Sequence, residues 1–290
     1  MDAGNADLEI FIMDIAGIDY SEQEEIKINM SGKVYIIGAG PGAADLLTVR
    51  AANILRSAQV VLHDDLVSRE VLDLVPSAAN TINVGKRCGN HSTSQEQIHA
   101  LMISHAQKGS TVVRLKSGDP AIFGRLGEEI DALRESQIAF EVVPGITAAH
   151  AGAAAASFTL TDRRSASALV LLTAHHCANG SRALFDPAKT TYAVYMPGPD
   201  YGKTAHQLLA MGLDEDTPCA LISQVSSSQQ QVRFLELSQL HAVTGVPAPA
   251  LLIVGEVTRR KELAELDLPS LMTASQDFSP QTSLRNLVNG

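Results

Sequence analysis

Short runs of β-branched and aliphatic residues alternate with amphipathic stretches from Gly32 onward. This alternation predicts a mostly parallel sheet with helices packed on it. The predicted strands of the first half are VYIIGAG, QVVLHD, NTINVG, TVVRLK and FEVVPG. Between them, apolar residues recur at helical spacing over residues 46–55 and again over 98–105. The first half is therefore expected to form an α/β domain.

A second set of strands follows an alanine-rich stretch that begins after Pro144 and Gly145. These predicted strands are ALVLLTA, TYAVYM, PCALIS, VRFLEL and ALLIVGEV, with few long helical patterns between them, so a mixed sheet is expected. We therefore divide the chain into an N-terminal extension (1–31), an N-terminal α/β domain (32–144), a C-terminal α/β domain (145–260) and a tail (261–290). The polar tail lacks a sustained period and is predicted to be flexible.

Charge and composition narrow the class of protein. The chain of 290 residues has a net charge of −10, which disfavours nonspecific nucleic-acid binding, and no nucleic-acid partner is expected. No apolar run approaches a membrane span, and the apolar patch near the N-terminus lacks the basic flank of a signal peptide. Three widely spaced cysteines, Cys88, Cys177 and Cys219, favour a reducing compartment, so a cytoplasmic location is expected. The segment His175-His176-Cys177 has no partner cluster at metal-ligand spacing, and no metal is expected.

Glycine and polar residues gather where two predicted strands end, at the edge where open α/β sheets bind small molecules. The first strand runs into Gly38-Ala39-Gly40-Pro41-Gly42, and the fourth runs into Ser117-Gly118-Asp119-Pro120. Glycines permit a tight turn and let the backbone approach a ligand. The spacing Gly38-x-Gly40-x-x-Ala43 also fits a relaxed dinucleotide fingerprint, with Asp64 placed where an acid would hold a ribose. A flavin or nicotinamide enzyme therefore stays open at this point.

Basic residues lie close to these motifs and could form a local basic cleft for an anionic ligand. They are Lys86, Arg87, Arg114, Lys116, Arg125, Arg163 and Arg164. Scattered lysine and arginine side chains are more often simply solvated. Asp64 could likewise be a helix cap, and Met196, which ends an apolar strand, would ordinarily pack in a core.

Five motifs in order resemble those of the tetrapyrrole methylases: GAGPGAADLLTVRAANIL, VVLHDDLVS, VGKRCG, VVRLKSGDPAIFGRLGEE and FEVVPGITAA. The resemblance covers roughly Gly32 to Val257 and implies two α/β domains with a cleft between them, usually as a homodimer. It implies S-adenosylmethionine as methyl donor, bound without a Rossmann site. Within the family, the motifs are most similar to those of members that methylate two pyrrole carbons of uroporphyrinogen III. The implied product is precorrin-2, which leads to sirohaem and cobalamin.

The resemblance also implies roles for single residues. It assigns S-adenosylmethionine to Pro41, Ser117, Gly118, Asp119, Ile122, Thr147, Ala148, Met196 and Val225. It makes Asp64 the proton acceptor and Lys86 the proton donor. Arg125 and Arg163 are the candidates for binding substrate carboxylates, because arginine engages carboxylates through two points, and Arg125 is also counted as catalytic. Either arginine could instead pair with a neighbouring acid, Glu128 or Asp162.

Several residues depart from the family pattern and leave the substrate open. Ser117 replaces the first glycine of the usual Gly-Gly-Asp, His63 stands where tyrosine commonly precedes the acid, and Val225 replaces a glycine. Pro197 and Pro199 are added to the loop after Met196. A methyltransferase acting at another corrin step and a non-catalytic S-adenosylmethionine-binding protein are the alternatives. The length beyond the motifs is too short for a second module for oxidation or iron insertion, so a fused enzyme is not expected.

Overall fold

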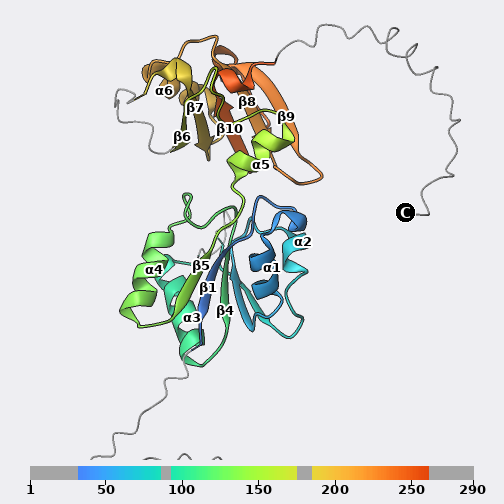
Figure 1. The fold of residues 1–290 in the computed structure, drawn as a ribbon, viewed down its shortest axis with the longest axis vertical. Helices are drawn as coiled ribbons and strands as arrows, with labels where there is room; N and C mark the ends of the chain where they lie inside the picture. The colour runs from blue at the N-terminus through green and yellow to red at the C-terminus, as the bar shows by residue number, and fades with distance from the viewer. Residues whose placement is uncertain (1–31, 86–92, 175–184, 261–290) are drawn as a thin grey trace, which may run out of the picture.

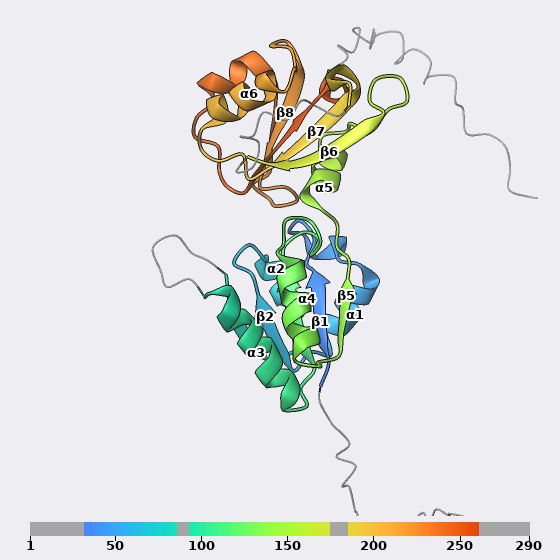
Figure 2. The same cartoon turned by 90° about the vertical axis from the view of Figure 1, so that its left-hand side faces the viewer.

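Two lobes, each built on a five-stranded sheet, make up the computed structural model (Figures 1 and 2). The structure describes residues 32–85, 93–174 and 185–260. The predicted N-terminal extension, the predicted tail, Lys86, Arg87 and the segment His175-His176-Cys177 lie outside the described residues. The division of the chain at residues 144–145 stays a prediction.

The first lobe contains a fully parallel sheet of five strands in the order β3-β2-β4-β1-β5. The strands are β1 (Val34–Gly38), β2 (Val60–His63), β3 (Asn80–Asn83), β4 (Val112–Lys116) and β5 (Phe140–Val143). All five lie within the segments predicted from the sequence. Every residue of β4 is buried, as expected for a central strand covered on both faces.

Helices cover both faces of the parallel sheet (Figure 1). Helices α1 (Val49–Leu55) and α2 (Arg69–Leu72) pack on one face, and α3 (Gln95–Gln107) and α4 (Leu126–Glu135) pack on the other. The pattern over 46–55 predicted a helix, but α1 begins only at Val49. Thr48 caps it by accepting a hydrogen bond from the Ala51 N–H at 3.1 Å, and residues 44–46 form a separate 3-10 turn, η1 (Ala44–Leu46).

The second lobe contains the expected mixed sheet, with the order β6-β7-β10-β8-β9. Its strands are β6 (Ala168–Thr173), β7 (Thr190–Tyr195), β8 (Pro218–Ser223), β9 (Gln231–Glu236) and β10 (Ala250–Val254). β6 and β7 are parallel, and the other pairs are antiparallel. Helix α6 (Tyr201–Ala210) and the 3-10 helix η3 (Leu237–Ala242) cover one face, and α5 (Ala148–Ala155) covers the other. The 3-10 turns η2 (Pro187–Lys189) and η4 (Glu256–Thr258) complete the lobe.

The carboxyl ends of the parallel strands point toward the second lobe (Figure 2). Three loops touch backbone to backbone there, because glycine stands at each contact. Gly40 and Gly118 exchange hydrogen bonds of 3.2 and 2.7 Å. A Cβ atom added at Gly145 would lie 2.3 Å from the Gly118 carbonyl oxygen, and one added at Gly38 would lie 2.6 Å from it. The loops after β1, β4 and β5 therefore form one closely packed floor beneath the second lobe.

None of the helices in the described ranges has the length and apolar character needed to cross a membrane.

Candidate functional site

A cavity of about 240 Å³ lies where this floor faces the second lobe. Its lining includes all nine residues to which the resemblance assigned S-adenosylmethionine: Pro41, Ser117, Gly118, Asp119, Ile122, Thr147, Ala148, Met196 and Val225. Asp64 lines the same cavity. These residues follow six different strands, so the fold gathers at one place side chains that are far apart in the sequence.

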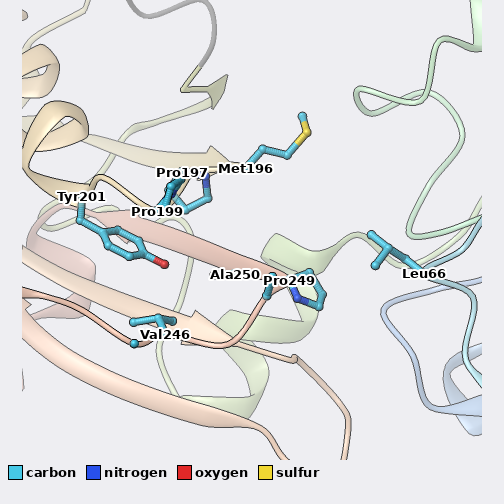
Figure 3. A pocket seen from close by; sticks show the side chains of 11 residues that line it. Leu66, Met196, Pro197, Pro199, Tyr201, Val246, Pro249 and Ala250 are labelled. Carbon is cyan, nitrogen blue, oxygen red and sulfur yellow. The ribbon is translucent and has the colours of Figure 1, made fainter. Parts of the chain in front are cut away.

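A second, larger cavity of about 680 Å³ adjoins the first and shares Leu66, Met196, Pro249 and Ala250 with it. Its wall is largely apolar. Figure 3 shows Leu66, from the first lobe, on the opposite side of this cavity from Tyr201 of the second. The Met196 side chain is 48% exposed, so it lies at the wall of the cavities and not in a core. Together the two volumes fall within the range of about 300–1,000 Å³ that is usual for small-molecule sites.

Asp64 directly follows β2, and its side chain is 29% exposed at the cavity wall. Arg114 Nη2 donates a hydrogen bond to Asp64 Oδ1 over 2.5 Å. Asp64 does not cap the helix that follows, because Ser68 fills that place and accepts the Val71 N–H at 3.2 Å. The helix-cap interpretation of Asp64 is therefore wrong, and its carboxylate is held by a buried arginine instead.

Arg114 and Lys116 do not form the basic cleft that the sequence suggested. Both lie on β4 and are only 3% exposed, and both bind the fully buried carboxylate of Glu129 on α4. The distances to Glu129 Oε1 are 3.1 Å from Arg114 Nε and 2.7 Å from Lys116 Nζ. Burial lowers the pKa of the Lys116 ammonium, Arg114 lowers it further, and the Glu129 carboxylate opposes both effects. Both cations are thus counter-charges of Glu129, and Lys116 also lines the 240 Å³ cavity.

The Asp119 carboxylate also serves the fold. Its Oδ1 accepts the Ala121 N–H at 2.8 Å, and its Oδ2 accepts the Gly145 N–H at 2.9 Å. It therefore joins the loop after β4 to the loop after β5. Asp119 lines the cavity while its two oxygens hold the floor of the cavity in shape.

The two candidate arginines lie outside the cavity linings. Arg125 is the N-cap of α4 and has φ 54°. It makes a two-point ion pair with Glu128, with distances of 2.7 Å from Nε and 2.6 Å from Nη2. Arg163 is exposed in the loop after α5, and the neighbouring Arg164, not Arg163, pairs with Asp162. Pairing with an adjacent acid is therefore confirmed for Arg125 only.

Sequence reasoning missed several residues of the cavity walls. Phe123 is 44% exposed, and its ring centroid lies 5.2 Å from that of Tyr195, so the two aromatic residues join the lobes across the site. Tyr195 also accepts the Ala149 N–H at 3.3 Å through its hydroxyl oxygen. Phe123 and Leu66 lie inside quoted motifs, but Pro249 and Ala250 carried no signal that pointed to a ligand.

The comparisons with known proteins agree with this geometry. Residues 33–241 match the family model described as Tetrapyrrole (Corrin/Porphyrin) Methylases. The chain belongs to this family. Its curated relatives include siroheme synthase 1 of Pectobacterium atrosepticum, which is 41% identical over 244 residues. The match covers 83% of this chain and 51% of the relative. The chain thus spans about half the length of the curated relatives it matches.

Two solved structures of the family have the same two-lobe fold. Uroporphyrin-III C-methyl transferase from Thermus thermophilus, complexed with S-adenyl homocysteine, is 33% identical with a TM-score of 0.65; the match covers 78% of this chain and 98% of that one. A cobalt precorrin-4 methyltransferase is 28% identical with a TM-score of 0.68, covering 80% and 97%. The predicted two-domain α/β fold with a parallel and a mixed sheet is confirmed.

Proposed function

We propose that this tetrapyrrole methylase transfers methyl groups from S-adenosylmethionine to two pyrrole carbons of uroporphyrinogen III, giving precorrin-2. One observation carries the proposal: the nine residues predicted to contact the methyl donor line a single cavity together with the carboxylate of Asp64. The similarity to a uroporphyrin-III C-methyl transferase complexed with S-adenyl homocysteine supports both the donor and the substrate.

The described residues fit a ligand that is part polar and part apolar. Gly118 has φ 67°, and a Cβ atom there would meet nothing within 4 Å, so its missing side chain leaves room beside the backbone. Ile122, Met196 and Val225 provide apolar surface for an adenosyl or thioether group. When bound, S-adenosylmethionine supplies an electrophilic methyl group. The role of the chain is to exclude water and align the pyrrole carbon with that methyl.

Asp64 is the group proposed to take the proton that must leave the macrocycle after methylation. Arg114 donates a hydrogen bond to Asp64 Oδ1, and no described residue donates one to Asp64 Oδ2. A carboxylate held at one oxygen keeps the other available for a proton, which suits a general base. Lys86, the proposed proton donor, lies outside the described residues.

Arg125 and Arg163 are proposed to bind carboxylates of the tetrapyrrole. Glu128 engages two of the five N–H donors of the Arg125 guanidinium, so the others are left for a second acid. Arg163 has no ion pair with a described residue, and its exposed side chain is available. A homodimer and a cytoplasmic location are also part of this proposal, supported by the resemblance and by the spacing of the three cysteines.

The proposal is tested by incubating the protein anaerobically with uroporphyrinogen III and S-adenosylmethionine and measuring the tetrapyrrole by mass spectrometry. We expect the wild type to add two methyl groups. Asp64→Asn should keep the fold and the affinity for S-adenosylhomocysteine but slow transfer by about 10²-fold or more, the usual contribution of a general base. Asp214→Asn, which removes an exposed acid in the second lobe, is the matched control and should behave as the wild type. Donor binding without methyl transfer to uroporphyrinogen III would contradict the proposal.

A second candidate is methyl transfer at another corrin step. The fold likeness to a cobalt precorrin-4 methyltransferase favours it, as do the departures at Ser117, His63 and Val225. The same assay with a later corrin intermediate separates the two candidates, because only the true acceptor gains mass. A protein that binds S-adenosylhomocysteine but transfers no methyl to either acceptor would instead be a non-catalytic binding protein.

A further inference from the structure

Glu129 lies on α4 and is fully buried between this helix and the parallel sheet. A buried carboxylate is unusual in a protein interior. Glu129 Oε1 accepts three hydrogen bonds, from Lys116 Nζ (2.7 Å), Arg114 Nε (3.1 Å) and Gln95 Nε2 (3.2 Å). Its Oε2 has no partner among the residues that the structure describes. An unpartnered buried oxygen is costly, so stabilisation of α4 alone does not account for an acid at this position.

Arg114 connects this buried acid to the cavity. Its Nε binds Glu129, its Nη2 binds Asp64 Oδ1 at 2.5 Å, and its Nη1 lies 3.4 Å from the Leu62 carbonyl oxygen and 3.3 Å from that of Leu115. The guanidinium group is planar and rigid. Fixing Nε and Nη1 therefore also fixes the direction in which Nη2 meets Asp64.

The charges of this group alternate and balance. Asp64 and Glu129 are the acids, and Arg114 and Lys116 are the cations. Without the Glu129 carboxylate, the two buried cations would have Asp64 as their remaining acidic partner in this group. Buried ions whose partner is removed rearrange or lose their charge, since the protein interior stabilises them poorly. Asp64 would then be drawn toward the cations and away from its place at the cavity wall.

We propose that Glu129 is a positioning residue, which acts through Arg114 to hold the Asp64 carboxylate in one orientation at the wall of the cavity. The inference rests on the proposed function, in which Asp64 accepts a proton from the tetrapyrrole. Glu129 itself touches neither cavity, because it is absent from both linings.

The test is a double-mutant cycle with Glu129→Gln and Asp64→Asn, measured as single-turnover methyl transfer to uroporphyrinogen III. Glu129→Gln alone should slow transfer about tenfold, within the usual size of coupling between residues of one hydrogen-bond network. KM and S-adenosylhomocysteine affinity should change less than about twofold. In the Asp64→Asn background the same substitution should change the rate less than about twofold. Asp131→Asn, which removes an exposed acid from the same helix, should match the wild type.

Glu129→Asp extends the test, because it keeps the charge but shortens the side chain. It should remain folded but transfer methyl groups several-fold more slowly than the wild type. If Glu129→Gln fails to fold, Glu129→Asp replaces it in the double-mutant cycle with Asp64→Asn. Wild-type turnover in Glu129→Asp, or equal slowing by Glu129→Gln in both backgrounds, would overturn the inference while leaving the proposed function intact. Absence of methyl transfer by the wild type would instead overturn the proposed function, and the inference with it.

Discussion

An Asp119→Asn substitution is expected to destabilise the fold even when no ligand is bound. Both oxygens of the carboxylate accept backbone N–H groups, from Ala121 at 2.8 Å and from Gly145 at 2.9 Å. Asparagine keeps one oxygen and turns an amide NH₂ toward the other N–H, so one of the two bonds is lost and a donor is left facing a donor. A hydrogen bond to a charged group contributes about 1.5–3 kcal/mol, and we expect a loss of about 2 kcal/mol.

Thermal unfolding followed by circular dichroism measures this loss. At about 2–4 °C per kcal/mol for a chain of this size class, the midpoint should fall by about 4–8 °C. Asp214→Asn is the control, because it removes an exposed acid whose side chain forms no hydrogen bond with another residue that the structure describes. An unchanged midpoint with S-adenosylhomocysteine affinity reduced more than about tenfold would refute this reasoning. Asp119 would then act as the ligand contact that the family resemblance implies, and not as a clamp between loops.

Three further predictions concern packing, thiol chemistry and pH. Gly145→Ala should lower the free energy of unfolding by about 1–3 kcal/mol in urea titrations, because its Cβ would lie 2.3 Å from the Gly118 carbonyl oxygen. Gly127→Ala in α4 is the control: its Cβ would meet nothing within 4 Å, so the free energy of unfolding should rise by about 0.5–1 kcal/mol. Burial raises the pKa of the Cys219 thiol to about 12, so iodoacetamide should label Cys219 only after unfolding, as read by peptide mass spectrometry. Hydrogen bonds from Lys33 and a neighbouring arginine lower the pKa of Glu141, so its contribution to stability is present above the unfolded pKa and is lost as pH falls through the lower folded value. Glu141→Gln should therefore weaken the pH dependence of the unfolding midpoint between about pH 5 and 3, and an unchanged dependence would contradict this.

Most of the strands could be predicted because burial on one or both faces leaves a plain pattern of β-branched and aliphatic residues, whereas β3 has no buried residue. The start of α1 could not, since Leu46 and Leu47 continue the apolar spacing and only the Thr48 side chain decides where the helix begins. Helix boundaries depend on such single capping bonds, which compete with the longer hydrophobic period.

The roles of Arg114 and Lys116 were misjudged although the sequence held a signal. Two residues apart on a strand, they point to the same face, and they alternate with Val113 and Leu115, which pack on the opposite face. Their partner Glu129 could not be found from spacing, because it faces them only once α4 packs on the sheet. In the same way, Leu66 and Phe123 lie inside quoted motifs but were not assigned to the site, because only the meeting of the two lobes places them, with Pro249 and Ala250, in the cavity wall.

Backbone strain in the described ranges is concentrated around the cavity. Of the seven non-glycine residues with positive φ, Gln137 and Ser157 end turns that follow helices, and the other five lie in the loops that border the site: Phe123, Arg125, Met196, Gln224 and Ser226. Each such residue costs about 1–3 kcal/mol and persists only where the surroundings fix it. Ser226 illustrates how they are fixed, since its Oγ accepts the Ala43 N–H at 3.2 Å and so joins the glycine loop to the second lobe. The two well-packed sheets supply the stability that these loops lack, and the loops are thereby held in shapes that their own sequences do not favour.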